Sequence, residues 1–223
     1  MANVRRGRCA LCGHETTKGN MSKHLTRCPQ LPEQVTGAGT GKPETLLRLR
    51  MQDGYGGAFW IDVEVRRACT LSDVDEYLRA IWLECCGHMS KFSIGGWGGT
   101  DVAKSRPVQA VLADGVELTH IYDFGTESVT RINAVGSRQA VPLSRRPITL
   151  MARNLPPEVV CVECDQPASH LCQECQLDWE SPGTLCVRHA KAHPHDEYGE
   201  PVAIVNSPRM GMCGYTGPAE PPY

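Results

Sequence analysis

The sequence predicts an α+β protein with a small N-terminal zinc finger, a central mostly antiparallel sheet with a packed helix, and a C-terminal cross-brace module for two zinc ions. Cysteines and histidines gather in closely spaced pairs near both ends of the chain. Between them, short segments alternate apolar and polar residues as half-buried strands do, and one segment has the apolar spacing of an amphipathic helix. With 223 residues, 41% of them hydrophobic, the chain has room for one conventional domain and smaller modules.

The central domain is expected over residues 45–152. Alternation of apolar and polar residues predicts an opening β-hairpin, with strands over 46–52 and 58–67 around the glycine-rich turn 53–57. Four further strands are expected, over 91–94, 116–123, 127–135 and 148–152. A hairpin, a helix and then further strands, in this order, are typical of a helix packed on a mostly antiparallel sheet.

The helix of this domain is expected over 70–85. Apolar residues recur there at spacings of three and four, from Leu71 to Trp82, which predicts one buried face. Thr70 or Ser72 is expected to cap its first turn, because a hydroxyl oxygen can accept from a free backbone N–H.

Residues 1–29 have the spacing of a CCHC zinc finger of the ββα type. The pair Cys9 and Cys12 forms the first half of the site, and His24 and Cys28 form the second half after an eleven-residue spacer. Two thiolates separated by two residues can both point at one tetrahedral ion about 2.3 Å away.

The finger helix is expected over 21–28, after Asn20 or Ser22, so that His24 and Cys28 share one face. Met21 is the expected core residue, but the aromatic residue usual in such fingers is absent. Most of the folding free energy is therefore expected from the metal, which supplies on the order of 10 kcal/mol in such peptides.

A second set of metal ligands is expected in a module over 157–217. Its ligand pairs follow one another as Cys161 and Cys164, Cys172 and Cys175, Cys186 and His189, and His193 and His195. Four ligand pairs that follow one another along the chain indicate cross-brace wiring. In this wiring the first and third pairs hold one zinc ion, and the second and fourth pairs hold another. Cys213 is an alternative to one histidine of the last pair. The finger and this module together predict about three zinc ions per chain.

Disulfides are the alternative interpretation of the 12 cysteines. Pairing in CxxC units interleaved with histidines favours metal ligation over a disulfide scaffold.

Charge is unevenly distributed along the chain, although the net charge is only −2. The first 30 residues carry one acidic residue against six basic ones, which are Arg5, Arg6, Arg8, Lys18, Lys23 and Arg27. These six form the expected nucleic-acid-binding surface, since clustered Lys and Arg contact phosphates. A zinc clip for protein contacts is the alternative for the same finger.

Residues 30–44 hold three glycines and two prolines with little that could pack, which predicts a flexible linker. The chain has no apolar run near the roughly 20 residues that cross a bilayer, and its polar start lacks the pattern of a secretory signal. We therefore expect a cytoplasmic protein without a membrane partner, and no feature identifies a small-molecule substrate.

The central domain resembles the plasmid pRi ORF-three-like family, which includes a passenger protein of a mycobacterial insertion element. The likeness covers about residues 45–151 and rests on LLRLRM, FWIDVEV, the helix start at Thr70, Gly87-His88-Met89 and IYDFGTESVTRI. It implies an α+β fold and an association with plasmids or mobile elements, but no settled reaction.

The C-terminal ligand spacing resembles a B-box or ZZ-type module. That resemblance implies a surface for binding another protein. Its ten-residue spacer and the close pair His193 and His195 depart from the B-box pattern.

Two functions follow as hypotheses. The first is a non-enzymatic adaptor or regulator that contacts DNA or RNA through the finger and a protein through the C-terminal module. The second is an enzyme of unknown reaction in the central domain, with Cys86, His88 and Asp123 as candidate groups. If the three residues were buried at separate places, the enzyme hypothesis would be weakened.

Overall fold

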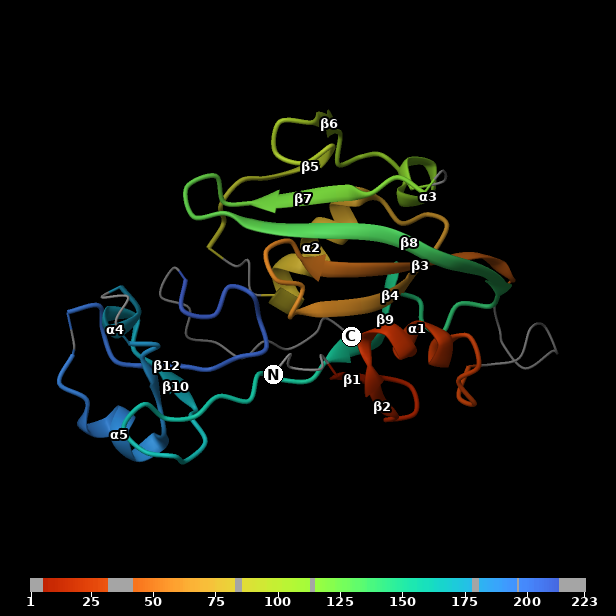
Figure 1. Ribbon diagram of the computed structural model, residues 1–223. Helices are drawn as coiled ribbons and strands as arrows, with labels where there is room; N and C mark the ends of the chain where they lie inside the picture. Colours follow the sequence, from red (N-terminus) through yellow and green to blue (C-terminus); the bar gives the residue numbers. More distant parts are fainter. Residues whose placement is uncertain are drawn as a thin grey trace. The chain divides into compact units, whose positions relative to one another are not determined.

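The computed structural model describes residues 6–31, 42–82, 86–112, 115–177, 181–195 and 197–212 (Figure 1). The described residues fall into two compact units, one that ends at Leu155 and one that begins at Pro156. The predicted α+β class is confirmed, since a large antiparallel sheet dominates the first unit and helices are few.

The first unit is built on a nine-stranded sheet of order β2-β1-β9-β4-β3-β8-β7-β5-β6, in which neighbouring strands are antiparallel. Its strands are β1 (Arg6–Cys9), β2 (Glu15–Thr17), β3 (Glu44–Asp53), β4 (Trp60–Val65), β5 (Ser90–Ile94), β6 (Thr100–Val102), β7 (Leu118–Tyr122), β8 (Ser128–Ala140) and β9 (Ile148–Asn154). The short strand β6 and the helix α3 (Val108–Val111) have no counterpart in the sequence prediction.

Helix α2 (Leu71–Trp82) covers one face of this sheet, as Figure 1 shows. Its apolar side joins the main hydrophobic cluster with inward residues of the strands, among them Leu49 and Val63. Thr70 caps the helix as expected: Asp73 N–H donates to Thr70 Oγ1, and Asp73 Oδ2 accepts from the Thr70 N–H.

The finger is continuous with this sheet. Strand β1 pairs with β9, with Arg8 opposite Arg153, so the finger hairpin forms one edge of the sheet. Helix α1 (Lys18–Leu25) packs on the sheet through a second hydrophobic cluster that includes Trp60 and Met151. The sheet therefore supplies the apolar core that the finger sequence lacks.

Helix α1 begins earlier than expected. Thr17 is its N-cap and accepts from the Asn20 N–H at 3.4 Å, so the helix opens at Lys18 rather than Met21. It ends at Leu25, which places Cys28 beyond the helix, in the following turn. The expected shared helical face for His24 and Cys28 was wrong for this reason. Of the expected linker, residues 32–41 lie outside the described residues.

Strand β4 also differs from its expected half-buried pattern, because every residue from Trp60 to Val65 is buried. Ile61 and Val63 face the α2 cluster, whereas Trp60 belongs to the cluster under α1. Since strand side chains alternate between faces, the finger buries the face that also carries Asp62 and Glu64.

The second unit holds a three-stranded antiparallel sheet of order β11-β10-β12. Its elements are β10 (His170–Leu171), α4 (Gln173–Leu177), β11 (Thr184–Leu185), α5 (Val187–Ala192) and β12 (Val202–Ala203). Its core is small and consists mainly of cysteines together with Leu185. In the part of the chain that the structure describes, no helix is long and apolar enough to cross a membrane.

Candidate metal centres

The finger brings Cys9, Cys12, His24 and Cys28 together, with their ligand atoms all within 4.8 Å of one another. Cys9 ends strand β1, and a turn in which the Gly13 N–H donates to the Cys9 carbonyl brings Cys12 back beside it. Cys9 Sγ lies 3.9 Å from Cys28 Sγ, and Cys12 Sγ lies 3.3 Å from His24 Nε2. This set could hold one metal ion.

The first C-terminal cluster comprises Cys161, Cys164, Cys186 and His189. Cys186 is the N-cap residue of α5, and His189 lies within that helix. The Sγ atoms of Cys161, Cys164 and Cys186 lie 3.2, 3.5 and 3.6 Å from His189 Nδ1.

The second C-terminal cluster comprises Cys172, Cys175, His193 and His195. Cys175 Sγ lies 3.2 Å from His193 Nε2 and 3.1 Å from His195 Nδ1. The two C-terminal clusters alternate along the chain, which is the cross-brace wiring that the ladder predicts. Cys213, the alternative ligand, lies outside the described residues.

These distances fit tetrahedral metal sites. Ligands about 2.3 Å (sulfur) and 2.0 Å (nitrogen) from one ion stand about 3.8 Å apart for two sulfurs and about 3.5 Å for sulfur and nitrogen. The two Sγ pairs that approach most closely, Cys9 with Cys28 and Cys164 with Cys186, are 3.9 and 4.0 Å apart. A disulfide needs about 2.05 Å. The described cysteines are free, so the disulfide alternative was wrong for them.

Cys9 of the finger and Cys161 of the C-terminal module differ in acidity. Burial raises the pKa of Cys9 to about 11, although hydrogen bonds from the backbone of Cys12 and Leu11 act to lower this pKa. Burial also acts to raise the pKa of Cys161, but hydrogen bonds from His189 and from backbone N–H groups outweigh it and lower this pKa to about 6. A metal bound in the finger must therefore displace a tightly held proton from Cys9.

The six basic residues expected to contact nucleic acid do not form one free surface. Arg8 donates to Glu15 Oε1 at 2.6 Å, and the Lys18 ammonium donates to the Gln52 side chain and the Gly57 carbonyl of the sheet. Three others, Arg6, Lys23 and Arg27, are exposed, and Arg5 lies outside the described residues.

Sequence reasoning missed a buried ion pair between strands β3 and β4, beneath the finger. Arg50 donates to both carboxylate oxygens of Asp62 at 2.8 and 2.6 Å, and also to the Lys18 carbonyl and Ser22 Oγ, each at 3.1 Å. Its guanidinium lies 4.9 Å from the centre of the Trp60 ring. The available signal was the alternation of charged with apolar residues in two neighbouring strands, Arg48 and Arg50 in β3 and Asp62 and Glu64 in β4.

A second polar cluster that the sequence did not reveal surrounds Asp75 of helix α2. Asp75 accepts from Ser90 Oγ at 2.5 Å, Lys104 Nζ at 2.9 Å and Arg79 Nε at 3.0 Å, and lies 2.7 Å from His120 Nε2. Burial would raise the pKa of Asp75, but these hydrogen bonds, led by that from His120, outweigh it and hold the pKa well below its ordinary value.

Two of the candidate enzyme groups come together. His88 Nδ1 lies 3.5 Å from Asp123 Oδ2, and the His88 ring contacts Tyr122 edge-on at 5.8 Å. Asp123 is the one described non-glycine residue with positive φ, at 63°. Cys86 is exposed.

Comparison with known proteins leaves the family open. No family model matches the chain, and no curated protein matches it. Among solved structures, a protein of unknown function from Methanosarcina mazei Go1, MM3350, is similar at a TM-score of 0.40 and 16% identity, covering 48% of this chain and 68% of that one.

Proposed function

We propose that the chain is a non-enzymatic zinc-binding adaptor or regulator. The observation that carries this proposal is that each of the three clusters offers four Cys or His ligands within 4.8 Å. A catalytic zinc usually has three protein ligands and a water, whereas four protein ligands complete a tetrahedral site. Closed, thiolate-rich sites support structural zinc, at about three ions per chain.

The finger is the proposed contact to DNA or RNA. Lys23 and Arg27 are exposed at the end of α1 and beyond it, and Arg6 is exposed on β1. Cations on one small module supply the phosphate contacts on which such binding depends. Because one finger reads only about 3 bp, we expect weak binding with little sequence preference.

The C-terminal module is the proposed contact to a protein partner. Five large apolar side chains of this unit are more than two-fifths exposed: Val160, Val162, Leu177, Val187 and Tyr198. Exposed apolar side chains of this kind support protein binding. From residue 153 onward the chain carries ten acidic residues against four basic ones, and this excess of negative charge disfavours contact with a polyanion.

The likeness of the central domain to the pRi ORF-three-like family is part of the proposal. An α+β domain with a helix on an antiparallel sheet agrees with the fold that the likeness implies. The likeness is the ground for proposing an association with plasmids or mobile elements. A cytoplasmic location is also part of the proposal.

An enzyme remains the second candidate, and the contact between His88 and Asp123 favours it. A carboxylate that orients an exposed imidazole is an arrangement used in general acid–base catalysis. Turnover of any substrate that is lost in both Cys86→Ser and His88→Ala, with zinc content unchanged, would support this candidate over the adaptor.

Nucleic-acid binding across a salt series tests the adaptor directly. Fluorescence anisotropy with a duplex DNA and a single-stranded RNA should show affinity that falls with salt. The double variant Lys23→Gln, Arg27→Gln should reduce the slope of log K against log salt by about 1.4 to 1.8, since each phosphate contact contributes about 0.7 to 0.9.

The matched control is Arg67→Gln, Arg106→Gln, which removes two exposed positive charges from loops outside the finger. It should leave the slope unchanged. Absent binding, or binding that does not respond to salt, would remove the nucleic-acid role while leaving the metal sites untouched.

A further inference from the structure

A pocket of about 590 Å³ lies between the end of the finger and the sheet. Its apolar lining includes Leu25 and Leu31 from the finger and Leu46 and Met151 from the sheet. Pockets of about 300 to 1,000 Å³ with a mostly apolar lining and a few placed polar groups are typical of small-molecule sites.

The charged groups at this pocket are not balanced. On the strand face beneath the finger, Asp62 accepts two hydrogen bonds from Arg50, and Glu64 accepts two from Arg138. All four measure 2.6 to 2.8 Å. Arg48 lies on the same face, opposite Glu64 of β4, and both residues line the pocket. This face therefore carries three guanidinium groups against two carboxylates.

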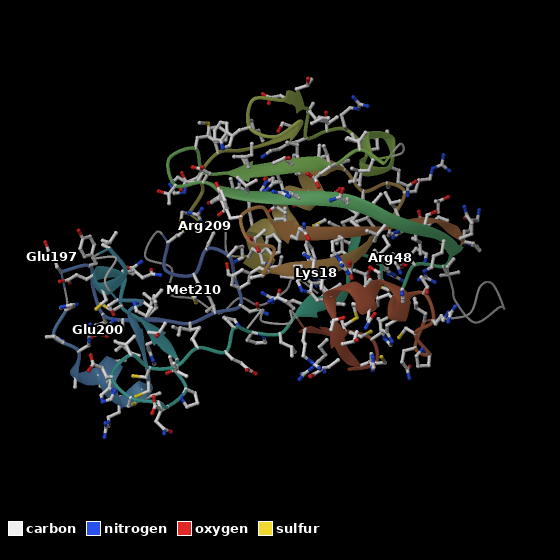
Figure 2. The ribbon with its side chains drawn as sticks, in the orientation of Figure 1. Lys18, Arg48, Glu197, Glu200, Arg209 and Met210 are labelled. Carbon is white, nitrogen blue, oxygen red and sulfur yellow. The ribbon has the colours of Figure 1, made fainter. Side chains whose placement is uncertain are left out.

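Within the described part of the chain, Arg48 has one protein hydrogen bond. Its Nη2 donates to the Val135 carbonyl at 3.3 Å, and its buried Nε has no partner. Burial, the leading cause, lowers the pKa of Arg48, although the charges of Asp62 and Glu64 act to raise it. Figure 2 shows Arg48 on the side of the sheet where Lys18 of α1 lies.

A second cation stands at the same pocket. Arg27 lines it from the finger and is exposed, and its side chain has no ion pair with the residues that the structure describes. Two arginines that form no ion pair with a described carboxylate therefore line a cavity with an apolar floor. A guanidinium fork matches the planar oxygens of a carboxylate or phosphate.

We propose that this pocket binds a small organic anion, with its carboxylate or phosphate held by Arg48 and Arg27 and its apolar or aromatic body on the leucines and Met151. The ligand would supply a further counterion to a face that carries one more guanidinium group than carboxylates. The site needs both the finger and the sheet, so it exists only where the finger is docked. It does not depend on nucleic-acid binding.

Calorimetry on the zinc-loaded full chain tests this proposal with two matched probes. 2-Naphthoate, an aromatic carboxylate, should bind at one site per chain, and the neutral amide 2-naphthamide should bind about tenfold more weakly or not at all. Arg48→Met should weaken naphthoate binding by about tenfold or more, because the buried charge is lost while the apolar volume is kept. Arg67→Gln, the charge-matched control, should bind as the wild type does.

A second variant keeps the test valid if Arg48→Met does not fold. Ser137→Trp fills the pocket from its exposed rim without a change of charge and should abolish naphthoate binding while leaving zinc content unchanged. Equal affinity for the acid and the amide, unchanged affinity in Ser137→Trp, or no naphthoate binding at millimolar concentration would overturn the proposal.

Discussion

Arg50 of β3 and Asp62 of β4 form a buried ion pair, 2.6 Å between Nη2 and Oδ2, on the sheet face beneath the finger. Asp62 is fully buried, and only about an eighth of the Arg50 side chain is exposed. The same guanidinium donates to the Lys18 carbonyl and to Ser22 Oγ of helix α1. Arg50, held by Asp62, thus fixes where helix α1 of the finger lies on the sheet.

Asp62→Asn should therefore destabilise the first unit by about 3 kcal/mol, because it leaves the Arg50 charge buried without a counterion. Urea unfolding followed by circular dichroism measures the loss. Glu15→Gln is the matched control, since its pair with Arg8 is exposed and should contribute less than about 1 kcal/mol. Equal effects of the two substitutions would contradict the role assigned to Arg50.

Gly7 is required by the close approach of β1 to the sheet. A Cβ there would lie 2.4 Å from the Trp60 ring and 2.5 Å from the Arg153 carbonyl oxygen. Gly7→Ala should separate β1 from β9 and destabilise the finger by about 2 kcal/mol or more, as overpacking of a core does. Limited proteolysis near residues 6–31 would detect the separation.

Gly19→Ala is the control for that substitution. Gly19 lies in α1 with open space around its Cα, and alanine should stabilise the helix by up to about 1 kcal/mol. If both variants resist protease as the wild type does, β1 is not packed as described.

The Asp75 cluster predicts a defined pH dependence. The pKa of Asp75 is lowered in the folded state, so its stabilisation is fully present above its unfolded pKa of about 3.9 and is lost as pH falls through the lower folded value. Asp75→Asn should cost about 2 to 3 kcal/mol at pH 5 to 8, since it removes charged hydrogen bonds to Arg79 and Lys104.

Denaturant unfolding of Asp75→Asn and wild type across pH measures this difference. It should stay constant from pH 8 to 5 and shrink below about pH 4. A difference that disappears already near pH 6 would show that another group carries the stabilisation.

Local patterns in the sequence predicted most of the elements and the ligand groups. Alternation located β3, β4, β7 and β8, and the Thr70 cap located α2, because these signals depend only on neighbouring residues. The cysteine and histidine spacings likewise predicted the three ligand groups, because a tetrahedral ion restricts which spacings can close around it.

Contacts between distant segments were not predictable in this way. Pairing of β1 with β9 joins residues about 145 positions apart, and no local pattern encodes it. It explains why β4 is buried on both faces and why the finger core, thin in sequence, is completed by Trp60 and Met151. The roles of Arg48, Asp62 and Asp75 depend on that packing.

Cross-brace wiring predicts how the zinc ions are lost. The chain between Cys164 and Cys186 of the first C-terminal cluster carries Cys172 and Cys175 of the second, and cysteines of both clusters share one small core. Cys175→Ser should therefore reduce zinc content from about three to about one, because a domain with so small a core depends on its metals.

Cys28→Ser is the comparison, since the finger cluster lies in the other unit. It should reduce zinc content from about three to about two. Metal analysis that finds about two ions in the Cys175→Ser variant would show that the C-terminal sites are independent.

The central claim is that closed clusters of four ligands hold structural zinc, and elemental analysis of the purified full chain tests it most directly. We predict about three zinc ions per chain, retained through gel filtration without added metal. A content of about one or less, or cysteines linked to one another in peptide mass spectra, would contradict it.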